Sequence, residues 1–257
     1  MADYWKRRDL IERTRLFDLT EAQLEKLLKT QYLRIYKEVR QQLLDLINSL
    51  PQNPTADQIY REDKFYKLLS ELQFKLDNLG TFEKDHMTDT FKDYFIKNAQ
   101  QTDVDFNLPI DNERVVRAIN NVWAGDGQNF SDRIWKDKRL LLERLKTGLI
   151  DTITTGRNWG SFSKQLQKEF GTSYNNARRL IRTELSHIQN ESSLYKYEAE
   201  GVEQVKFIVE KDNRLCPICR EYGDKIYDIK NAPRIPVHPQ CRCTYIPVVD
   251  VKNIGAN

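Results

Sequence analysis

All four cysteines of this 257-residue chain lie within 28 residues of one another near its C-terminal end. Cys216 and Cys219 form a Cys-x-x-Cys pair, and Cys241 and Cys243 follow His238 in the sequence His-Pro-Gln-Cys-Arg-Cys. Thiolates and imidazoles bind zinc in structural sites, and a short gap brings two such ligands to one side of a turn. We therefore predict one structural Zn²⁺ site. Its four positions are filled either by the four cysteines or by three of them with His238.

Other uses of the cysteines fit the sequence less well. Disulfides need an oxidising compartment, and the charged N-terminus lacks the apolar stretch of a signal peptide, so we expect a reducing cytosol. A thioredoxin-like pair would lie at a strand-to-helix junction, which the neighbouring prolines argue against. A catalytic zinc ion needs an open position and a general base, for which Glu221, Asp224, Asp212 or His187 would be candidates. We expect no enzyme; a zinc-dependent enzyme that processes nucleic acid is the alternative.

The charge balance limits the partners that the chain can attract. Its 41 basic and 38 acidic residues give a net charge of +3, which is too balanced to predict strong binding to nucleic acid. From residue 160 onward there are 15 basic and 12 acidic residues, so the small excess is C-terminal. Weak, non-specific binding to double-stranded DNA remains an alternative. No apolar run approaches the roughly 20 residues of a membrane span, so we expect no membrane partner.

The first part of the chain has the periodicity of long helices. Thr20-Glu-Ala-Gln23 fits a capping box, and apolar residues then recur every three or four positions from Leu24 to Leu50. A segment with two prolines follows. The next pattern predicts a second helix from about Asp57 to Leu79, which ends at Gly80.

The middle of the chain is also helical, whereas the cysteine region has strand character. Val205–Val209 and Thr244–Val249 are rich in β-branched and aromatic residues, and they flank the cysteines. The fold class predicted is mainly α with a small C-terminal α+β zinc-binding module, in which long N-terminal helices pack on a helical middle region. The predicted middle helices run from Ser131 to near Gly156, from Ser161 to Gly171, and from about Ser173 to Glu200.

Several motifs between Trp123 and Val249 occur together in one known family. They are Phe130-Ser-Asp-Arg-Ile-Trp135, Asn176-Ala-Arg-Arg-Leu-Ile-Arg-Thr-Glu-Leu185, Asp212-Asn-Arg-Leu-Cys-Pro-Ile-Cys219 and His238-Pro-Gln-Cys-Arg-Cys243. With these motifs the chain resembles the phage head morphogenesis, or Mu F-like, minor head proteins of tailed phages. The resemblance implies three regions: a variable N-terminal helical region (1–112), the helical part of the Mu F-like domain (113–200), and a β-rich zinc-binding module (201–257).

The resemblance also implies a place and a role in the virion. A protein of this family would bind the portal protein during procapsid assembly in the host cytoplasm. It would then stay in the capsid interior near the portal, close to the DNA, and aid DNA ejection. Scaffolding protein or major capsid protein are further partners that the resemblance implies.

Three charged residues on the last predicted helix are candidates for interaction or bracing. Arg182 follows Arg178 by four residues, so both side chains point the same way. One interpretation is a basic ridge that contacts portal protein or DNA. The other, which we favour, is that Arg182 and Glu184 brace the zinc module through charge-assisted hydrogen bonds to its loops.

Overall fold

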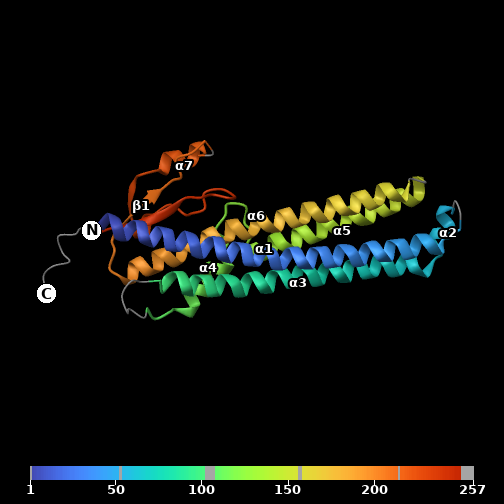
Figure 1. Ribbon diagram of the computed structural model, residues 1–257, viewed down its shortest axis with the longest axis horizontal. Helices are drawn as coiled ribbons and strands as arrows, with labels where there is room; N and C mark the ends of the chain where they lie inside the picture. The colour runs from blue at the N-terminus through green and yellow to red at the C-terminus, as the bar shows by residue number, and fades with distance from the viewer. Residues whose placement is uncertain (1, 52–53, 102–107, 156–157, 214, 250–257) are drawn as a thin grey trace. The chain divides into compact units, whose positions relative to one another are not determined.

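The structure is a computed structural model that describes residues 2–51, 54–101, 108–155, 158–213 and 215–249 (Figure 1). Within these residues, helices of very different lengths accompany three short strands. None of the described helices is long and apolar enough to cross a membrane. In chain order the elements are α1 (Ala2–Ser49), α2 (Ala56–Tyr60), α3 (Asp63–Ala99), α4 (Asn112–Asn120), α5 (Phe130–Thr155), α6 (Trp159–Ala199), β1 (Gln204–Ile208), α7 (Pro217–Tyr222), β2 (Ile226–Asp228), the 3-10 turn η1 (Ile229–Asn231) and β3 (Thr244–Val248).

Helix α1 confirms the predicted apolar stripe but begins well before its predicted start. Leu24, Leu28 and Leu43 of the stripe are buried. The capping box predicted at Thr20 is wrong, because Thr20 lies inside α1 and its hydroxyl donates a hydrogen bond of 2.8 Å to the Leu16 carbonyl. A threonine in a helix interior commonly bonds the carbonyl four residues earlier, so its presence alone does not mark a helix start.

Two glycines that predict helix ends lie inside helices instead. Helix α3 continues through Gly80, where an added Cβ would lie 2.7 Å from Cζ3 of Trp135. The glycine therefore permits the close approach of the α5 indole ring. Helix α6 joins two predicted helices and continues through Gly171, where an added Cβ would meet open space. The predicted helix end near Gly156 lies outside the described residues.

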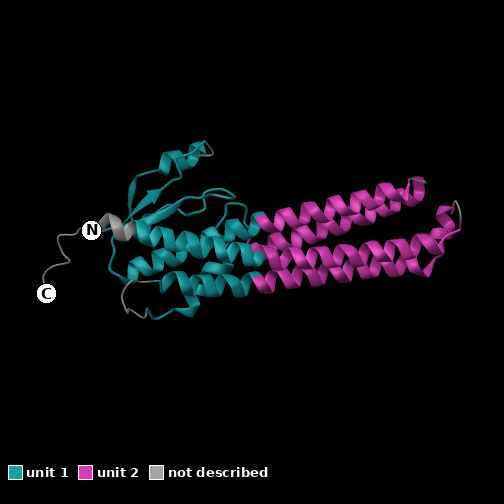
Figure 2. Cartoon of the chain, in the orientation of Figure 1, with its two compact units in different colours: residues 1–24, 87–127, 179–257 teal, residues 25–86, 128–178 magenta. Residues whose placement is uncertain are grey.

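The chain forms two compact units, each built from segments that are far apart in the sequence (Figure 2). Unit 1 contains residues 1–24, 87–127 and 179–257, and unit 2 contains residues 25–86 and 128–178. The two units are defined by which residues pack together. They do not test the predicted boundaries of the family regions after residues 112 and 200, which stay a prediction.

The regular secondary structure in the described residues of unit 2 is entirely helical. Segments of α1, α3, α5 and α6, together with α2, bury a common apolar core. Removing such side chains from water is the main stabilising contribution to a bundle of this kind. The core residues are Leu43, Leu46, Ile59, Phe65, Leu68, Leu149, Ile153 and Phe162.

A layer of polar side chains crosses the interior of unit 2. The Lys138 ammonium of α5 is 2% exposed and lies 2.8 Å from the Glu83 carboxylate of α3. The same ammonium contacts the Tyr32 hydroxyl of α1 and donates to Ser173 Oγ of α6 at 3.1 Å. Asp137 Oδ2 lies 3.0 Å from it. Burial raises the pKa of Glu83 and of Tyr32. Four helices thus each contribute a group to one buried network.

Unit 1 contains the three-stranded sheet, in the order β2-β1-β3. Both pairings are antiparallel, with Gln204 opposite Asp228 and Ile208 opposite Thr244. The two predicted strands are confirmed as β1 and β3. The core beneath them includes Val205, Phe207, Tyr245 and three of the cysteines. The mainly α fold with a small C-terminal sheet is therefore confirmed, and the cysteines are part of its core.

Candidate metal centre

Helix α7 presents the first pair of cysteines. Cys216 is the N-cap of α7, and its sulfur accepts a hydrogen bond of 3.2 Å from the Cys219 backbone N–H. Pro217 occupies the first helical position, where no N–H is needed and its fixed φ favours the helix. The pair therefore opens a helix, and residues 209–216 lie between the end of β1 and the start of that helix.

A tight turn presents the remaining candidate ligands. The Cys241 N–H donates a hydrogen bond of 3.1 Å to the His238 carbonyl, and Gln240 in between has a φ of 61°. His238 Nδ1 lies 2.9 Å from the Pro239 carbonyl, which leaves Nε2 directed at the cluster. A zinc-bound histidine typically donates its other ring N–H to such a carbonyl. The turn therefore gives His238 the environment of a metal ligand.

All five predicted ligands gather in two overlapping groups. The ligand atoms of Cys216, Cys219 and His238 lie within 4.8 Å of one another, and so do those of Cys219, Cys241 and Cys243. Cys219 Sγ is 3.7 Å from Cys241 Sγ and 3.2 Å from His238 Nε2. Two sulfurs bound to one tetrahedral zinc ion at about 2.3 Å would be about 3.8 Å apart. The donor set and its spacing therefore fit a zinc-type ion.

The thiols of the cluster perturb one another strongly. A hydrogen bond from the Cys243 thiol, in the first place, lowers the pKa of Cys241 to about 5. Burial raises the pKa of Cys219 to about 12. Cys219, Cys241 and Cys243 are all at most 5% exposed. A thiolate is the form that binds metal, so a divalent cation would replace protons that these sulfurs otherwise share.

Neighbouring residues hold the two ligand loops in place. The Arg242 guanidinium, between two candidate ligands, pairs with Asp212 at 2.7 Å, which lies shortly before Cys216 in the chain. On α6, Thr183 Oγ1 accepts the Gln240 N–H at 3.1 Å. Ser186 Oγ donates to the Cys241 carbonyl at 3.4 Å. The sequence interpretation missed both hydroxyls, and the only local sign of them is the polar character of this face of α6.

The structure places Arg178, Arg182 and Glu184 beside partners of their own. Arg182 forms an ion pair of 2.6 Å with Glu21. Glu184 accepts a hydrogen bond of 2.8 Å from the Trp123 indole N–H. Within unit 2, Arg178 pairs with Glu25 of α1 at 3.0 Å. In the sequence Arg182-Thr183-Glu184, it is Thr183 that contacts the cysteine loops, through the hydrogen bond from the Gln240 N–H. A role in interaction or bracing for the three charged residues stays a prediction.

The surface beside the cluster is hollowed into a groove of about 420 Å³. None of the residues considered as a general base (Glu221, Asp224, Asp212 and His187) is among its lining residues. His187 is instead buried within unit 1, where its ring stacks on Trp123 with centroids 4.9 Å apart. Its Nδ1 lies 3.4 Å from the Ile235 carbonyl. The lining residues are Arg182, Glu210, Leu215, Cys216, Cys219, His238, Pro239, Gln240, Arg242 and Cys243.

His187 makes the stability of the protein dependent on pH. Burial lowers its pKa from 6.5 to about 4, so between these values the unfolded chain takes up a proton that the folded chain does not. We expect the free energy of unfolding to have its full value above pH 6.5. It should decrease by up to roughly 3 kcal/mol as pH falls towards 4. Urea unfolding of the wild type and of His187→Gln at pH 7.5 and 4.5 tests this. The free-energy difference between the two proteins should change with pH; a constant difference would contradict the assignment.

The fold and the site together define a helical protein whose C-terminal sheet carries a cysteine–histidine cluster able to hold a metal ion. Residues 143–246 match the family described as phage Mu protein F like protein. This region includes the second half of α5, all of α6, β1, β2, the first three residues of β3 and the cluster, and the predicted resemblance is confirmed. Comparisons with curated proteins and with solved structures gave no match. The family assignment supports a role in phage head morphogenesis.

Proposed function

We propose that the protein is a minor head protein that binds the portal protein during procapsid assembly and stays in the capsid interior near the DNA. The observation that carries this proposal is the family match, which spans α6 and all five candidate metal ligands. The role is one of binding and assembly, and a part in DNA ejection would follow from a position at the portal. Scaffolding protein and major capsid protein are the other components that it would meet.

Within this role we propose that the cysteine cluster binds one structural zinc ion. Cys219, Cys241 and Cys243 would supply three thiolates, and either His238 or Cys216 would supply the fourth ligand. Several groups that satisfy the ligands are already in place, including the Cys219 N–H to the Cys216 sulfur and the Pro239 carbonyl at the His238 ring. A metal held in this way would stabilise the module, because thiolate-rich sites of this kind serve structure.

Portal binding is tested by coexpression. We expect the protein to elute with the portal oligomer in size-exclusion chromatography when it is made in one cell together with the portal protein of the same phage. A portal oligomer from an unrelated phage serves as the control and should elute alone. Separate elution of the two proteins from the same phage would contradict the proposal.

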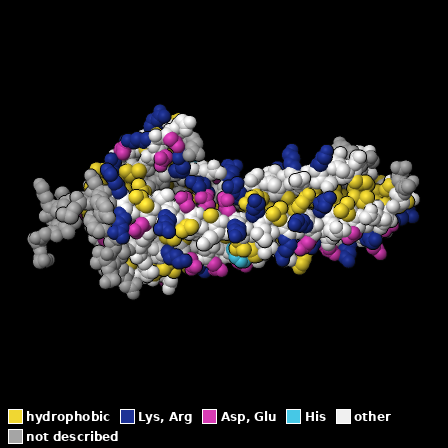
Figure 3. Space-filling model, in the orientation of Figure 1, with side chains coloured by type: hydrophobic (Ala, Val, Ile, Leu, Met, Phe, Trp, Pro, Cys, Tyr) yellow, Lys and Arg dark blue, Asp and Glu magenta, His cyan; other side chains and the backbone are white. Residues whose placement is uncertain are grey.

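A second candidate function is a weak contact with DNA, favoured by the charges of unit 2. Residues 128–178 contain ten Lys and Arg and five Asp and Glu, whereas residues 25–86 contain ten of each. Three of the five acids are engaged within the protein: Asp137 in the buried layer, Glu169 with Arg144, and Asp132 with a backbone N–H. On the face seen in Figure 3, basic side chains are spread along the molecule, including the part formed by α5 and α6. Lys136, Arg139, Lys164 and Lys168 are exposed, and none forms an ion pair with a residue that the structure describes.

Salt dependence separates this contact from a solvated basic surface. Neutralising phosphates with basic side chains releases counterions, so affinity for duplex DNA should fall linearly with the logarithm of salt concentration. We expect replacement of Lys136, Arg139, Lys164 and Lys168 by glutamine to reduce the slope by up to about one for each phosphate that is no longer neutralised. The matched control replaces the exposed Lys26, Lys29, Lys37 and Lys64 of unit 2 by glutamine. Equal slopes for the two variants would show that this surface does not contact DNA.

A further inference from the structure

One row of side chains attaches the first turns of α1 to the rest of unit 1. Asp9, Arg13, Phe17 and Glu21 follow one another at intervals of four residues, so they share one face of the helix. Asp9 lies 3.3 Å from the Lys196 ammonium, and Glu21 lies 2.6 Å from the Arg182 guanidinium. Since the order of partners along α6 runs opposite to α1, the row marks an antiparallel contact between the two helices.

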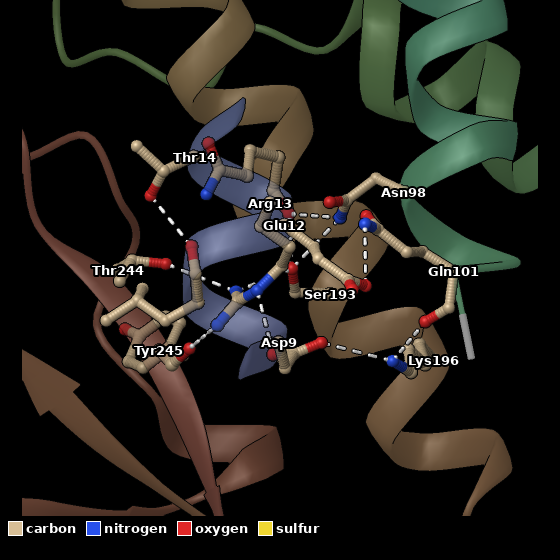
Figure 4. Close-up of polar contacts among 12 residues, drawn as sticks. Asp9, Glu12, Arg13, Thr14, Asn98, Gln101, Ser193, Lys196, Thr244 and Tyr245 are labelled. Carbon is tan, nitrogen blue, oxygen red and sulfur yellow. Dashed lines mark hydrogen bonds and ion pairs between the residues drawn. The ribbon is translucent and has the colours of Figure 1, made fainter. Parts of the chain in front are cut away.

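Arg13 is the most buried charged member of this row, with 2% of its surface exposed. Its Nη1 donates to Ser193 Oγ of α6 at 3.1 Å and to Thr244 Oγ1 at 3.4 Å. Its Nη2 donates to the Tyr245 carbonyl at 3.1 Å, and Asp9 Oδ2 lies 2.9 Å from Nε (Figure 4). A buried guanidinium is tolerated only when such acceptors surround it. The docking of this part of α1 therefore depends on the position of Thr244 and Tyr245, the first two residues of β3.

The start of β3 follows directly from the metal centre. Thr244 and Tyr245, which receive Arg13, are the two residues after Cys243, a candidate ligand. Cys241, Cys243, Thr244 and Tyr245 are all buried; the two cysteines belong to the cluster, and Thr244 and Tyr245 accept hydrogen bonds from Arg13. Ligation of both cysteines by one ion would fix the backbone from which the Arg13 acceptors project.

We propose that metal binding at the cysteine cluster controls the docking of residues 7–24 of α1. With metal bound, the segment from Cys241 to Tyr245 is ordered and completes the acceptors of Arg13. Without metal, the buried guanidinium loses the Thr244 and Tyr245 acceptors, so the first turns of α1 separate from α6 and the sheet. The face that carries Asp9, Arg13, Phe17 and Glu21 then becomes accessible to solvent. The inference rests on the proposed metal centre.

Hydrogen exchange measured by mass spectrometry tests this coupling on the full chain. Metal content is determined first, on the same sample, before and after chelation. On metal removal we expect amides of residues 7–24 to exchange at least about tenfold faster, whereas amides of residues 63–79 in unit 2 keep their rates. In the metal-loaded protein, Arg13→Met should speed up exchange of residues 7–24 without loss of metal. Arg15→Met, at an exposed position two residues later, is the matched control and should leave exchange unchanged.

The outcomes separate this inference from the metal centre itself. A chain that binds no metal when purified would overturn the proposed centre, and the inference with it. A chain that binds metal but exchanges residues 7–24 at the same rate after chelation would overturn only the coupling. Equal loss of protection along residues 179–199 of α6 would also overturn it, because the metal would then stabilise unit 1 as a whole.

Discussion

Joint replacement of Cys219 and Cys241 by serine is expected to abolish metal binding and to unfold the C-terminal module. Both sulfurs are buried, and Cys219 belongs to both ligand groups. Serine is a poor zinc ligand, and the binding free energy of a structural metal contributes directly to folding. We expect the variant to contain no zinc and to lose at least about 3 kcal/mol of unfolding free energy, as measured by elemental analysis and urea unfolding.

Single variants at the two remaining candidates identify the fourth ligand. Cys216→Ser and His238→Asn each remove one donor from the more exposed side of the cluster. The variant that removes the fourth ligand should bind zinc more weakly, in competition with a chromogenic chelator, by a factor of about ten or more. The other variant should resemble the wild type. Wild-type zinc affinity in the double variant Cys219→Ser/Cys241→Ser would contradict the assignment.

Lys138→Met is expected to be the most destabilising single change in unit 2. The ammonium forms ion pairs with two carboxylates of the buried layer, Glu83 at 2.8 Å and Asp137 at 3.0 Å. Methionine fills a similar volume but leaves the Glu83 carboxylate buried without its cation. Loss of one partner of a buried ion pair costs about 3–5 kcal/mol. Chemical unfolding of the variant should show a loss of this size.

A second change separates the missing charge from a packing defect. When Glu83→Leu is added to Lys138→Met, both charges are gone and much of the lost stability should return, because an apolar pair can replace a buried ion pair. Lys136→Met, at an exposed position of α5, is the matched control and should change stability by less than about 0.5 kcal/mol. A double variant no more stable than Lys138→Met would show that the polar layer acts through shape instead of charge.

Apolar periodicity was enough to predict the helices, but not where they begin and end. The stripe from Leu24 to Leu43 is buried as predicted, because every third or fourth residue of a helix lies on one face. The predicted helix end at Gly80 is wrong for a reason outside local sequence. Its missing Cβ makes room for Trp135, which lies 55 residues later in the chain. A glycine that ends a helix and one that admits a neighbour look the same in a sequence.

The candidate ligands could be predicted because their spacing is a local property. The long-range contacts around the site could not. Arg13 and Thr244 are more than two hundred residues apart, and their contact depends on the packing of α1 against the sheet. The one available signal was Arg13 itself, a charged residue four residues before the buried Phe17 and therefore on the same face of the helix. An arginine at such a position predicts buried hydrogen-bond acceptors, but the sequence does not show which residues provide them.

The metal content of the full chain tests the central claim most directly. Native mass spectrometry of protein purified without added metal should show a mass increase of one zinc ion per chain. In the same sample, thiol alkylation should be slow until a chelator is added, because ligated and buried thiolates react poorly. A folded chain that carries no zinc and has four freely reactive thiols would contradict the account.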